Sequence, residues 1–372
     1  MLALILQHYL PFSHAGIATT GVGKKHRPLV GVFVYEPWKS RAGKVKTRIY
    51  IDGYNFYYGC LKHTPYKWLD LEHLFRGYIL PRLERENSDI NSSPVIHPSD
   101  GIRFYTAEIN PKAAQDPNSL NDQRSYHAAL TNYRRSKDVE NTVKIIKGNY
   151  AVDKVNSRKV ELMSDSKEKE PRYCSTVKVW KFEEKQSDVN IAVDALFDVM
   201  LDHTIEHVVF VTNDTDIAPA LKKIRLLNDL SIRPHISISL VVPARKENNK
   251  YRTNKTLRDL ADWTIDYIEN HELASSQLPC RVANGKKSAL RPVSWFEHKE
   301  KVGEILELLC DQQVLGSLPR AWRWLSTPKK PDVSGLPTLN DDPSTMLHDL
   351  EGIAAVYQHA CAYAEFMKKI KE

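Results

Sequence analysis

One short run of residues limits most strongly what this chain can fold into. Residues 208–211, Val-Val-Phe-Val, lead directly into the polar string Thr-Asn-Asp-Thr-Asp. A continuous apolar run bounded by turn-forming residues is typical of a buried strand in a parallel sheet. Isoleucine and leucine then recur at helical spacing over residues 217–227, which predicts a helix. We therefore expect an α/β fold, with Asp214 and Asp216 at the carboxyl end of a strand, where such sheets bind ligands.

Two further segments are predicted to bring carboxylates to the same edge. Residues 47–51 alternate like a strand and meet Asp52 and Gly53, the glycine being suited to a tight turn. Residues 177–182 also alternate like a strand, and a helix is predicted to start at Ser187 or Asp188. Because the carboxyl ends of parallel strands meet at one edge, Asp52, Asp188, Asp214 and Asp216 are expected to lie together.

Some of these side chains also have an ordinary structural explanation. One aspartate of the 214/216 pair could cap the following helix while the other favours the helix dipole, and Asn55 could be the N-cap of the helix after Asp52. Asp194 follows Asp188 by six residues, about 240° further round a helix, so Asp188 is the better candidate. The cluster has no His or Cys partner, and an all-oxygen set of this kind favours Mg²⁺ or Mn²⁺. A divalent ion would also relieve the repulsion between the carboxylates.

Basic residues follow another predicted strand, residues 236–242. The formal net charge of the chain is +7, a mild bias toward polyanions. The basic side chains after that strand are expected to rim the acidic site and hold the phosphate backbone of RNA or another single-stranded nucleic acid. They are Arg245, Lys246, Lys250, Arg252 and Lys255.

The 372 residues are divided by their patterns into four parts. Residues 1–47 form an extension, 48–270 a catalytic domain, 271–294 a linker, and 295–372 a helical unit that is expected to contact a target or a protein partner. No apolar stretch reaches the roughly 18 residues of a membrane span. The five scattered cysteines suit a reducing cytoplasm. The sequence leaves the oligomeric state open, a homodimer included.

Three strings in the chain resemble the motifs of NYN domains, the PIN-like nucleases of the LabA and DUF88 group. They are YIDGYNFYYG, EEKQSDVNIAVDAL and VFVTNDTDIAPAL. The third family motif, S-G-D-x-D-F-x-P, keeps both acids and the proline here, whereas Gln186 and Ser187 replace the Gly and Val of the second, E-K-G-V-D-V. The resemblance implies a PIN-like three-layer α/β/α sandwich with a mostly parallel sheet, and a Mg²⁺ or Mn²⁺ site. The metal and catalytic residues would be Asp52, Asp188, Asp214 and Asp216, supported by Asn55, Asp194, Thr212 and Asn213.

The first functional hypothesis is therefore a metal-dependent ribonuclease, in which a metal-bound water attacks an RNA phosphodiester. One alternative is a regulatory or binding module that keeps the fold without hydrolysis. The last alternative is a pyridine-ring hydroxylase, an activity that some relatives of the group carry. It ranks lowest because no G-x-G-x-x-G string follows a predicted strand.

Overall fold

The computed structural model describes residues 43–86, 93–114, 116–133, 142–247, 252–284, 287–327, 339 and 342–371. Most of the predicted amino-terminal extension, and Lys250 of the predicted basic rim, lie outside the described residues.

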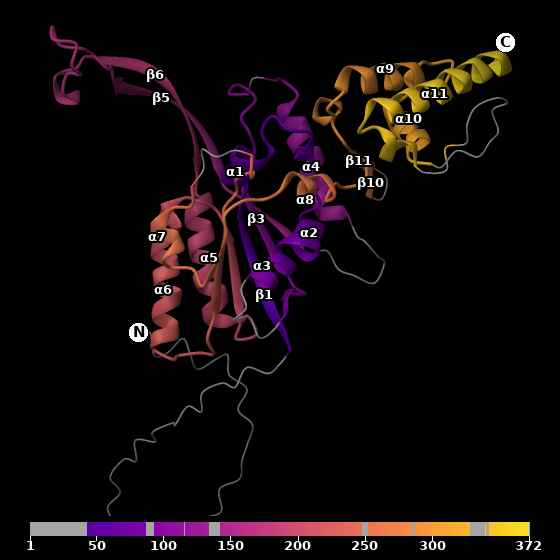
Figure 1. Ribbon diagram of the computed structural model, residues 1–372. Coiled ribbons are helices and arrows are strands. Elements are labelled where there is room, and N and C mark those ends of the chain that lie inside the picture. Colours follow the sequence, from indigo (N-terminus) through magenta and orange to yellow (C-terminus); the bar gives the residue numbers. More distant parts are fainter. Residues whose placement is uncertain are drawn as a thin grey trace, which may run out of the picture. The chain divides into compact units, whose positions relative to one another are not determined.

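A parallel sheet forms the centre of the fold (Figure 1). Its strand order is β4–β3–β1–β7–β8–β9, and β2 lies beside the first half of β1. All pairs in this sheet are parallel over the described residues. The α/β prediction with a mostly parallel sheet is confirmed. The strands are β1 (Lys44–Asp52), β2 (Ser93–Ile96), β3 (Ile102–Thr106), β4 (Val143–Lys147), β7 (His207–Val211), β8 (Ser237–Val241) and β9 (Trp263–Ile265).

The central strands are apolar because both of their faces are covered. Side chains alternate along a strand, so Ile49 and Ile51 of β1 enter one core while Tyr50 enters the other. The first core also holds residues of α2 (Leu71–Leu74), α3 (Leu80–Glu86) and α4 (Ser119–Asn132). The second holds residues of α5 (Ser187–Leu201) and α6 (Ala218–Asp229). Helices therefore cover both faces of the sheet.

Short helices complete the domain. α1 (Gly53–Phe56) follows β1 directly and continues into a π turn, Tyr57–Leu61. Another π turn, Phe75–Ile79, joins α2 to α3. α7 (Lys255–Arg258) follows β8, and α8 (Asn270–Ala274) follows β9.

The structure differs from expectation in three segments. The predicted strand at residues 177–182 belongs to β6 (Thr176–Lys185), which pairs antiparallel with β5 (Asn149–Arg158) as a hairpin separate from the central sheet (Figure 1). Alternation alone cannot tell such a hairpin from a sheet strand. The polar segment 85–101, where the sequence pattern indicates a loop, contains β2, and the predicted linker contains a hairpin of β10 (Arg281–Asn284) and β11 (Lys287–Leu290). Strands β2, β10 and β11 have four residues each, which is too short to give a clear strand pattern.

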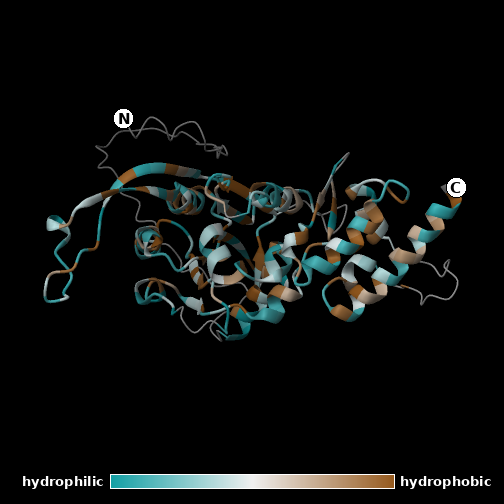
Figure 2. Cartoon of the chain, turned by 90° about the horizontal axis from the view of Figure 1, so that it is seen from above, coloured by the Kyte–Doolittle hydropathy of each residue, from teal (hydrophilic) through white to brown (hydrophobic). Residues whose placement is uncertain are grey.

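The remaining described residues are mainly helical. α9 (Lys299–Cys310), α10 (Leu318–Leu325) and α11 (Leu350–Lys371) share one apolar cluster that includes Val302, Trp322 and Val356. Figure 2 shows both hydrophilic and hydrophobic stretches along these helices, as expected for amphipathic elements. Among the described residues, no helix combines the length and hydropathy that a membrane crossing requires.

Candidate functional site

A pocket of about 370 Å³ opens where β1 and β7 end. Its acidic side chains come from the ends of β1 and β7, from β6 and from α5, and its aromatic side chains come from α1 and the π turn that follows. The lining residues are Asp52, Tyr54, Asn55, Tyr58, Gly59, Glu184, Asp188, Asn213, Asp214 and Pro243. The predicted gathering of Asp52, Asp188 and Asp214 at one edge is what the structure shows.

Asp52 is held from two sides. One carboxylate oxygen accepts the Asn55 N–H at 2.9 Å and so caps α1, while the other accepts the Thr212 hydroxyl at 3.3 Å. Asn55 in turn accepts the Asn213 N–H through its side-chain oxygen at 3.3 Å. The same hydrogen bonds therefore cap α1 and form part of the pocket wall. The predicted supporting residues Asn55, Thr212 and Asn213 fix the ends of β1 and β7 to each other.

Asp214 and Asp216 have different surroundings. Asp214 lines the pocket, and its carboxylate accepts the Asp216 N–H at 3.0 Å, which caps the 3₁₀ turn Thr215–Ile217. The Asp216 side chain is exposed and does not line the pocket. It nevertheless lies near enough to raise the pKa of Asp188.

The junction between β6 and α5 delivers two acids. Gln186 has φ +80°, in the left-handed region, at the position where the NYN motif has glycine. This turn reverses the chain so that Glu184 and Asp188 line one pocket. The Ser187 hydroxyl donates a hydrogen bond to Glu184. Glu184 was not selected as a candidate from the sequence, although it is the glutamate of the second motif.

Burial raises the pKa values of the acids. For Asp52, burial and then Asp188 and Asp214 outweigh the hydrogen bonds from Asn55 and Thr212, and its pKa rises to about 6. For Glu184, burial and then Asp52 and Asp188 outweigh the Ser187 hydrogen bond, and its pKa rises to about 7. Burial, followed by Asp214 and Asp216, also raises the pKa of Asp188. The pocket therefore holds carboxyl groups that exchange protons near neutral pH.

Tyrosines form the other wall. Tyr54 and Tyr58 lie one helical turn apart with ring centroids 6.2 Å apart, and Tyr54 stacks on Tyr150 of β5, also at 6.2 Å. The Lys62 ammonium lies 4.8 Å from the centre of the Tyr58 ring. The four-residue spacing of Tyr54 and Tyr58 was the sequence signal for this wall, since such residues share a helical face.

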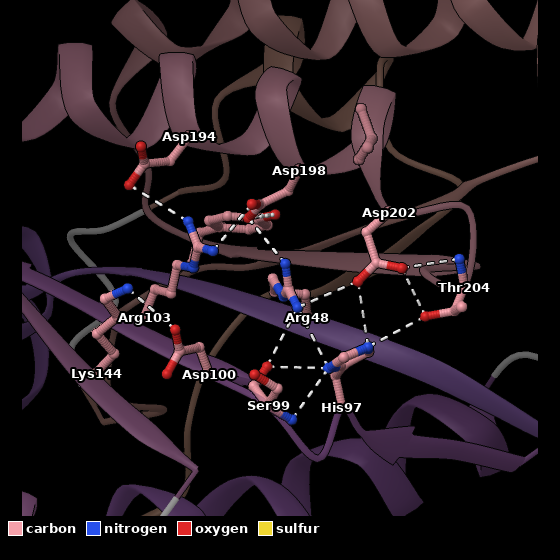
Figure 3. Close-up of polar contacts among 12 residues, drawn as sticks. Arg48, His97, Ser99, Asp100, Arg103, Lys144, Asp194, Asp198, Asp202 and Thr204 are labelled. Atoms are coloured by element: carbon pink, nitrogen blue, oxygen red, sulfur yellow. Dashed lines mark hydrogen bonds and ion pairs between the residues drawn. The ribbon is translucent and has the colours of Figure 1, made fainter. Parts of the chain in front are cut away.

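Asp194 is not among the lining residues, and its side chain points toward Arg103 (Figure 3). It accepts the Tyr105 hydroxyl at 2.9 Å and pairs with Arg103 at 3.5 Å. One turn further along α5, Asp198 pairs with Arg103 at 2.9 Å and with Arg48 at 3.2 Å. These acids face the sheet beneath α5, which follows from their angular distance from Asp188.

The structure describes four of the five residues of the predicted basic rim. Arg245 lies 3.9 Å from Glu247, and Lys246 lies 3.2 Å from Glu269. Arg252 and Lys255 are exposed, and the Arg252 carbonyl accepts the Asn213 side-chain amide at 3.1 Å. Their predicted contact with nucleic acid stays a prediction.

The predicted metal centre is not formed. Among the described side chains, no group of three or more His, Cys, Asp or Glu residues is arranged to hold a metal ion. The four aspartates were expected to converge on one point, but the Asp216 side chain is exposed outside the pocket lining, and the two oxygens of Asp52 accept the Asn55 N–H and the Thr212 hydroxyl. The prediction of Mg²⁺ or Mn²⁺ as cofactor is wrong.

Comparison with models of known protein families finds no match, so the NYN resemblance stays a prediction. A solved structure of a protein of unknown function from Vibrio parahaemolyticus is 17% identical, covering 60% of this chain and 92% of that one. Its TM-score is 0.30, and this likeness carries no argument.

A curated protein is much more similar. The 6-hydroxy-3-succinoylpyridine 3-monooxygenase HspA of Pseudomonas putida is 39% identical over 316 residues, which cover 85% of this chain and 93% of HspA. This relative is an oxidoreductase, so the predicted ribonuclease, and with it the hydrolase assignment, is wrong. The lowest-ranked alternative, a pyridine-ring hydroxylase, agrees better with the finding. At this identity over most of both sequences, the chain belongs to the family of the monooxygenase HspA.

Proposed function

We propose that this protein is a monooxygenase that oxygenates a hydroxylated pyridine ring, bound in the pocket at the carboxyl edge of the sheet. The observation that carries the proposal is the 39% identity to HspA along nearly the whole of both chains. In such a reaction one atom of O₂ enters the substrate and the other leaves as water, with two electrons and two protons supplied by a reductant.

The dimensions and walls of the pocket support a single-ring substrate. Its volume, about 370 Å³, lies at the small end of the range for ligand sites. Tyr54 and Tyr58 offer aromatic faces on which a pyridine ring can stack. The Lys62 ammonium beside Tyr58 suits an acidic side chain on that ring, such as a succinoyl group carries.

The acids of the pocket support proton transfer. Loss of the proton from a ring hydroxyl raises the electron density of the ring and makes a ring carbon a better nucleophile toward an activated oxygen. A base works best when its pKa lies near the working pH. Glu184, with a pKa of about 7, meets this condition, and Asp52, with a pKa of about 6, lies in the same pocket.

The pocket does not fit the phosphate of a flavin or nicotinamide cofactor. Among the described residues, its lining contains four carboxyl groups and no lysine or arginine. The Asn55 N–H of α1, which could otherwise bind an anion, donates to the carboxylate of Asp52. We therefore derive no step through such a cofactor in this pocket. The assay below tests which reductant supplies the electrons.

The assay supplies purified protein with ¹⁸O₂, a reduced nicotinamide, and a hydroxypyridine that carries an acyl acid side chain. We expect one labelled oxygen atom in the ring product and one reduced nicotinamide consumed per product, with free flavin added in a parallel arm. Folded protein that incorporates no label from O₂ in either arm would contradict the proposal. The visible absorption spectrum of the purified protein reports any bound chromophore.

Glu184→Gln is the sharpest variant for the proposed base. We expect kcat to fall roughly 100-fold, because the amide cannot take the ring proton. In the wild type the rate should rise with pH through about 7, as Glu184 loses its proton, and the variant should lose this limb. Glu183→Gln is the matched control, since Glu183 lies next to it on the opposite side of β6 and pairs with Lys181 at 2.9 Å. An unchanged pH profile in Glu184→Gln would remove Glu184 from the mechanism.

The finer fold assignment also belongs here. We propose that the sheet and its helices are PIN-like and of the NYN type. The convergence of all three motif strings on one pocket supports this, through Asp52, Asp188 and Asp214. In this proposal the family scaffold serves ring oxygenation instead of phosphodiester cleavage.

A further inference from the structure

Helix α5 exposes apolar residues to solvent and turns acidic residues toward the sheet. Its most exposed residues are all apolar: Val189 (64%), Val193 (56%), Phe197 (62%), Met200 (58%) and Leu201 (66%). Asp194 and Asp198 lie on the other side, where they pair with Arg103, and Asp198 also with Arg48, on strands of the sheet. A surface helix normally shows the opposite arrangement.

These apolar side chains form one stripe. Their spacings of four, four, three and one residues repeat at the period of a helix, so they share a face over about 18 Å. Coiled-coil seams use the same alternation of three and four residues. The face has the pattern of a helix that packs against another helix.

The stripe is extended by the neighbouring helix. α6 packs beside α5 and exposes Leu226 (43%), and Leu230 (58%) and Ile232 (63%) follow it. The adjacent Arg233 donates hydrogen bonds to the Val199 and Asp202 carbonyls, which fixes this end of α6 to the end of α5. Eight large apolar side chains, about half exposed or more, approach the roughly 800 Å² per partner that a stable interface needs. Monomeric proteins rarely leave such a patch uncovered.

We propose that the stripe is the interface with a second copy of this chain, in which α5 packs antiparallel on its counterpart. The stripe carries no charge, so a two-fold axis between Val193 and Phe197 places apolar groups on apolar groups and opposes no like charges. The area available matches that of a standard dimer. The inference is independent of the proposed oxygenation.

The first experiment measures the mass of the full-length protein in solution by sedimentation velocity over a range of concentrations. We expect twice the chain mass of 42.7 kDa. Phe197→Glu should weaken the dimer at least 100-fold, because two carboxylates would be buried at its centre. Leu318→Glu, which changes a 44% exposed leucine of α10, is the matched control and should remain dimeric. A monomeric wild type, or a dimer that Phe197→Glu leaves intact, would overturn the proposal.

A cross-linking experiment tests the antiparallel packing. A mixture of the Val189→Cys and Leu201→Cys proteins should form a mixed disulfide, while neither alone should cross-link beyond the wild type. Efficient cross-linking of Val189→Cys to itself would overturn the antiparallel arrangement. Circular dichroism verifies that each variant is folded. If Phe197→Glu is not, Val193→Ser takes its place and should shift the dissociation constant in the same direction.

Discussion

At the scale of single residues, Asp52 shows how one side chain serves both fold and site. It is 5% exposed, caps α1, ties β1 to the end of β7, and still lines the pocket. The helix cap, the hydrogen bond to Thr212 and the pocket lining all require the carboxylate at the end of β1. The burial that fixes it also disfavours its charge.

Asp52→Asn should therefore stabilise the protein at neutral and alkaline pH. The pKa of Asp52 rises from 3.8 to about 6 on folding, so between these values the folded state binds more protons and its stability falls as pH increases. Above about pH 6 the asparagine avoids this penalty, on the order of 2–3 kcal/mol, and it still accepts the cap hydrogen bond. Below about pH 4 the gain should vanish.

Thermal melts across pH measure this gain, with Asp229→Asn on the surface of α6 as the control that should change little. A gain that grows as the pH falls would contradict the sign.

Gly59 is a second residue whose identity follows from its surroundings. A Cβ at Gly59 would lie 1.6 Å from the Pro243 carbonyl oxygen, which is backbone and cannot turn aside. Gly59→Ala should therefore lower the free energy of unfolding by about 2 kcal/mol or more and distort the pocket. Gly303→Ala is the control: nothing lies within 4 Å of its Cβ position in α9, so stability should stay equal or rise by up to about 1 kcal/mol. Urea denaturation compares the two, and equal effects would contradict the steric account.

At the scale of elements, α5 is held to the sheet by ion pairs (Figure 3). Asp198 is 8% exposed and pairs with Arg48 and Arg103, and it also accepts the Tyr50 hydroxyl at 2.9 Å. Removing its charge leaves the buried guanidinium of Arg48 and the partly buried one of Arg103 with weaker partners.

Asp198→Asn should accordingly destabilise the protein by about 3 kcal/mol, as measured by chemical denaturation. The control is Glu72→Gln, whose partner Arg76 has a side chain 48% exposed, and which should change stability by less than about 1 kcal/mol. Similar losses in the two variants would mean that the buried network adds nothing beyond a surface pair.

The elements also show which parts of the fold and site were predictable. β7 followed from its continuous apolar run, and α5 and α6 followed from helical periodicity. Asp52, Asp188 and Asp214 followed from their places at the ends of such elements. The hairpin of β5 and β6 could not be predicted in this way, because the alternation within a strand does not identify the strand with which it pairs. Glu184 was missed with it, since only the hairpin carries this residue to the pocket. The chemistry was misjudged because carboxylates at a strand end suit either a metal or a proton transfer, and the difference depends on where their oxygens point.

At the scale of the whole chain, the separate apolar cores predict that the sheet domain folds independently of helices α9, α10 and α11. The sheet is enclosed by two apolar clusters, and α9, α10 and α11 share a third. Trp295 packs against the first cluster, whereas Phe296 belongs to the third.

A chain that ends at Glu297 should therefore keep a folded sheet and an active pocket. Circular dichroism and the oxygenation assay would test this, with the full chain as reference. Loss of the folded sheet on truncation would show that the third cluster is required for it, and would move the domain boundary predicted from the sequence.

The position of β1 in the sheet has a consequence for folding while the chain is being synthesised on the ribosome. Thr47 of β1 and its partner His207 of β7 are 160 residues apart in the chain, yet they lie side by side. At about 5–20 residues per second, β1 emerges roughly 10–30 s before its partner has been synthesised. For that time Ile49 and Ile51 lack one of their neighbours, so β1 is the segment where we expect a nascent-chain chaperone to bind.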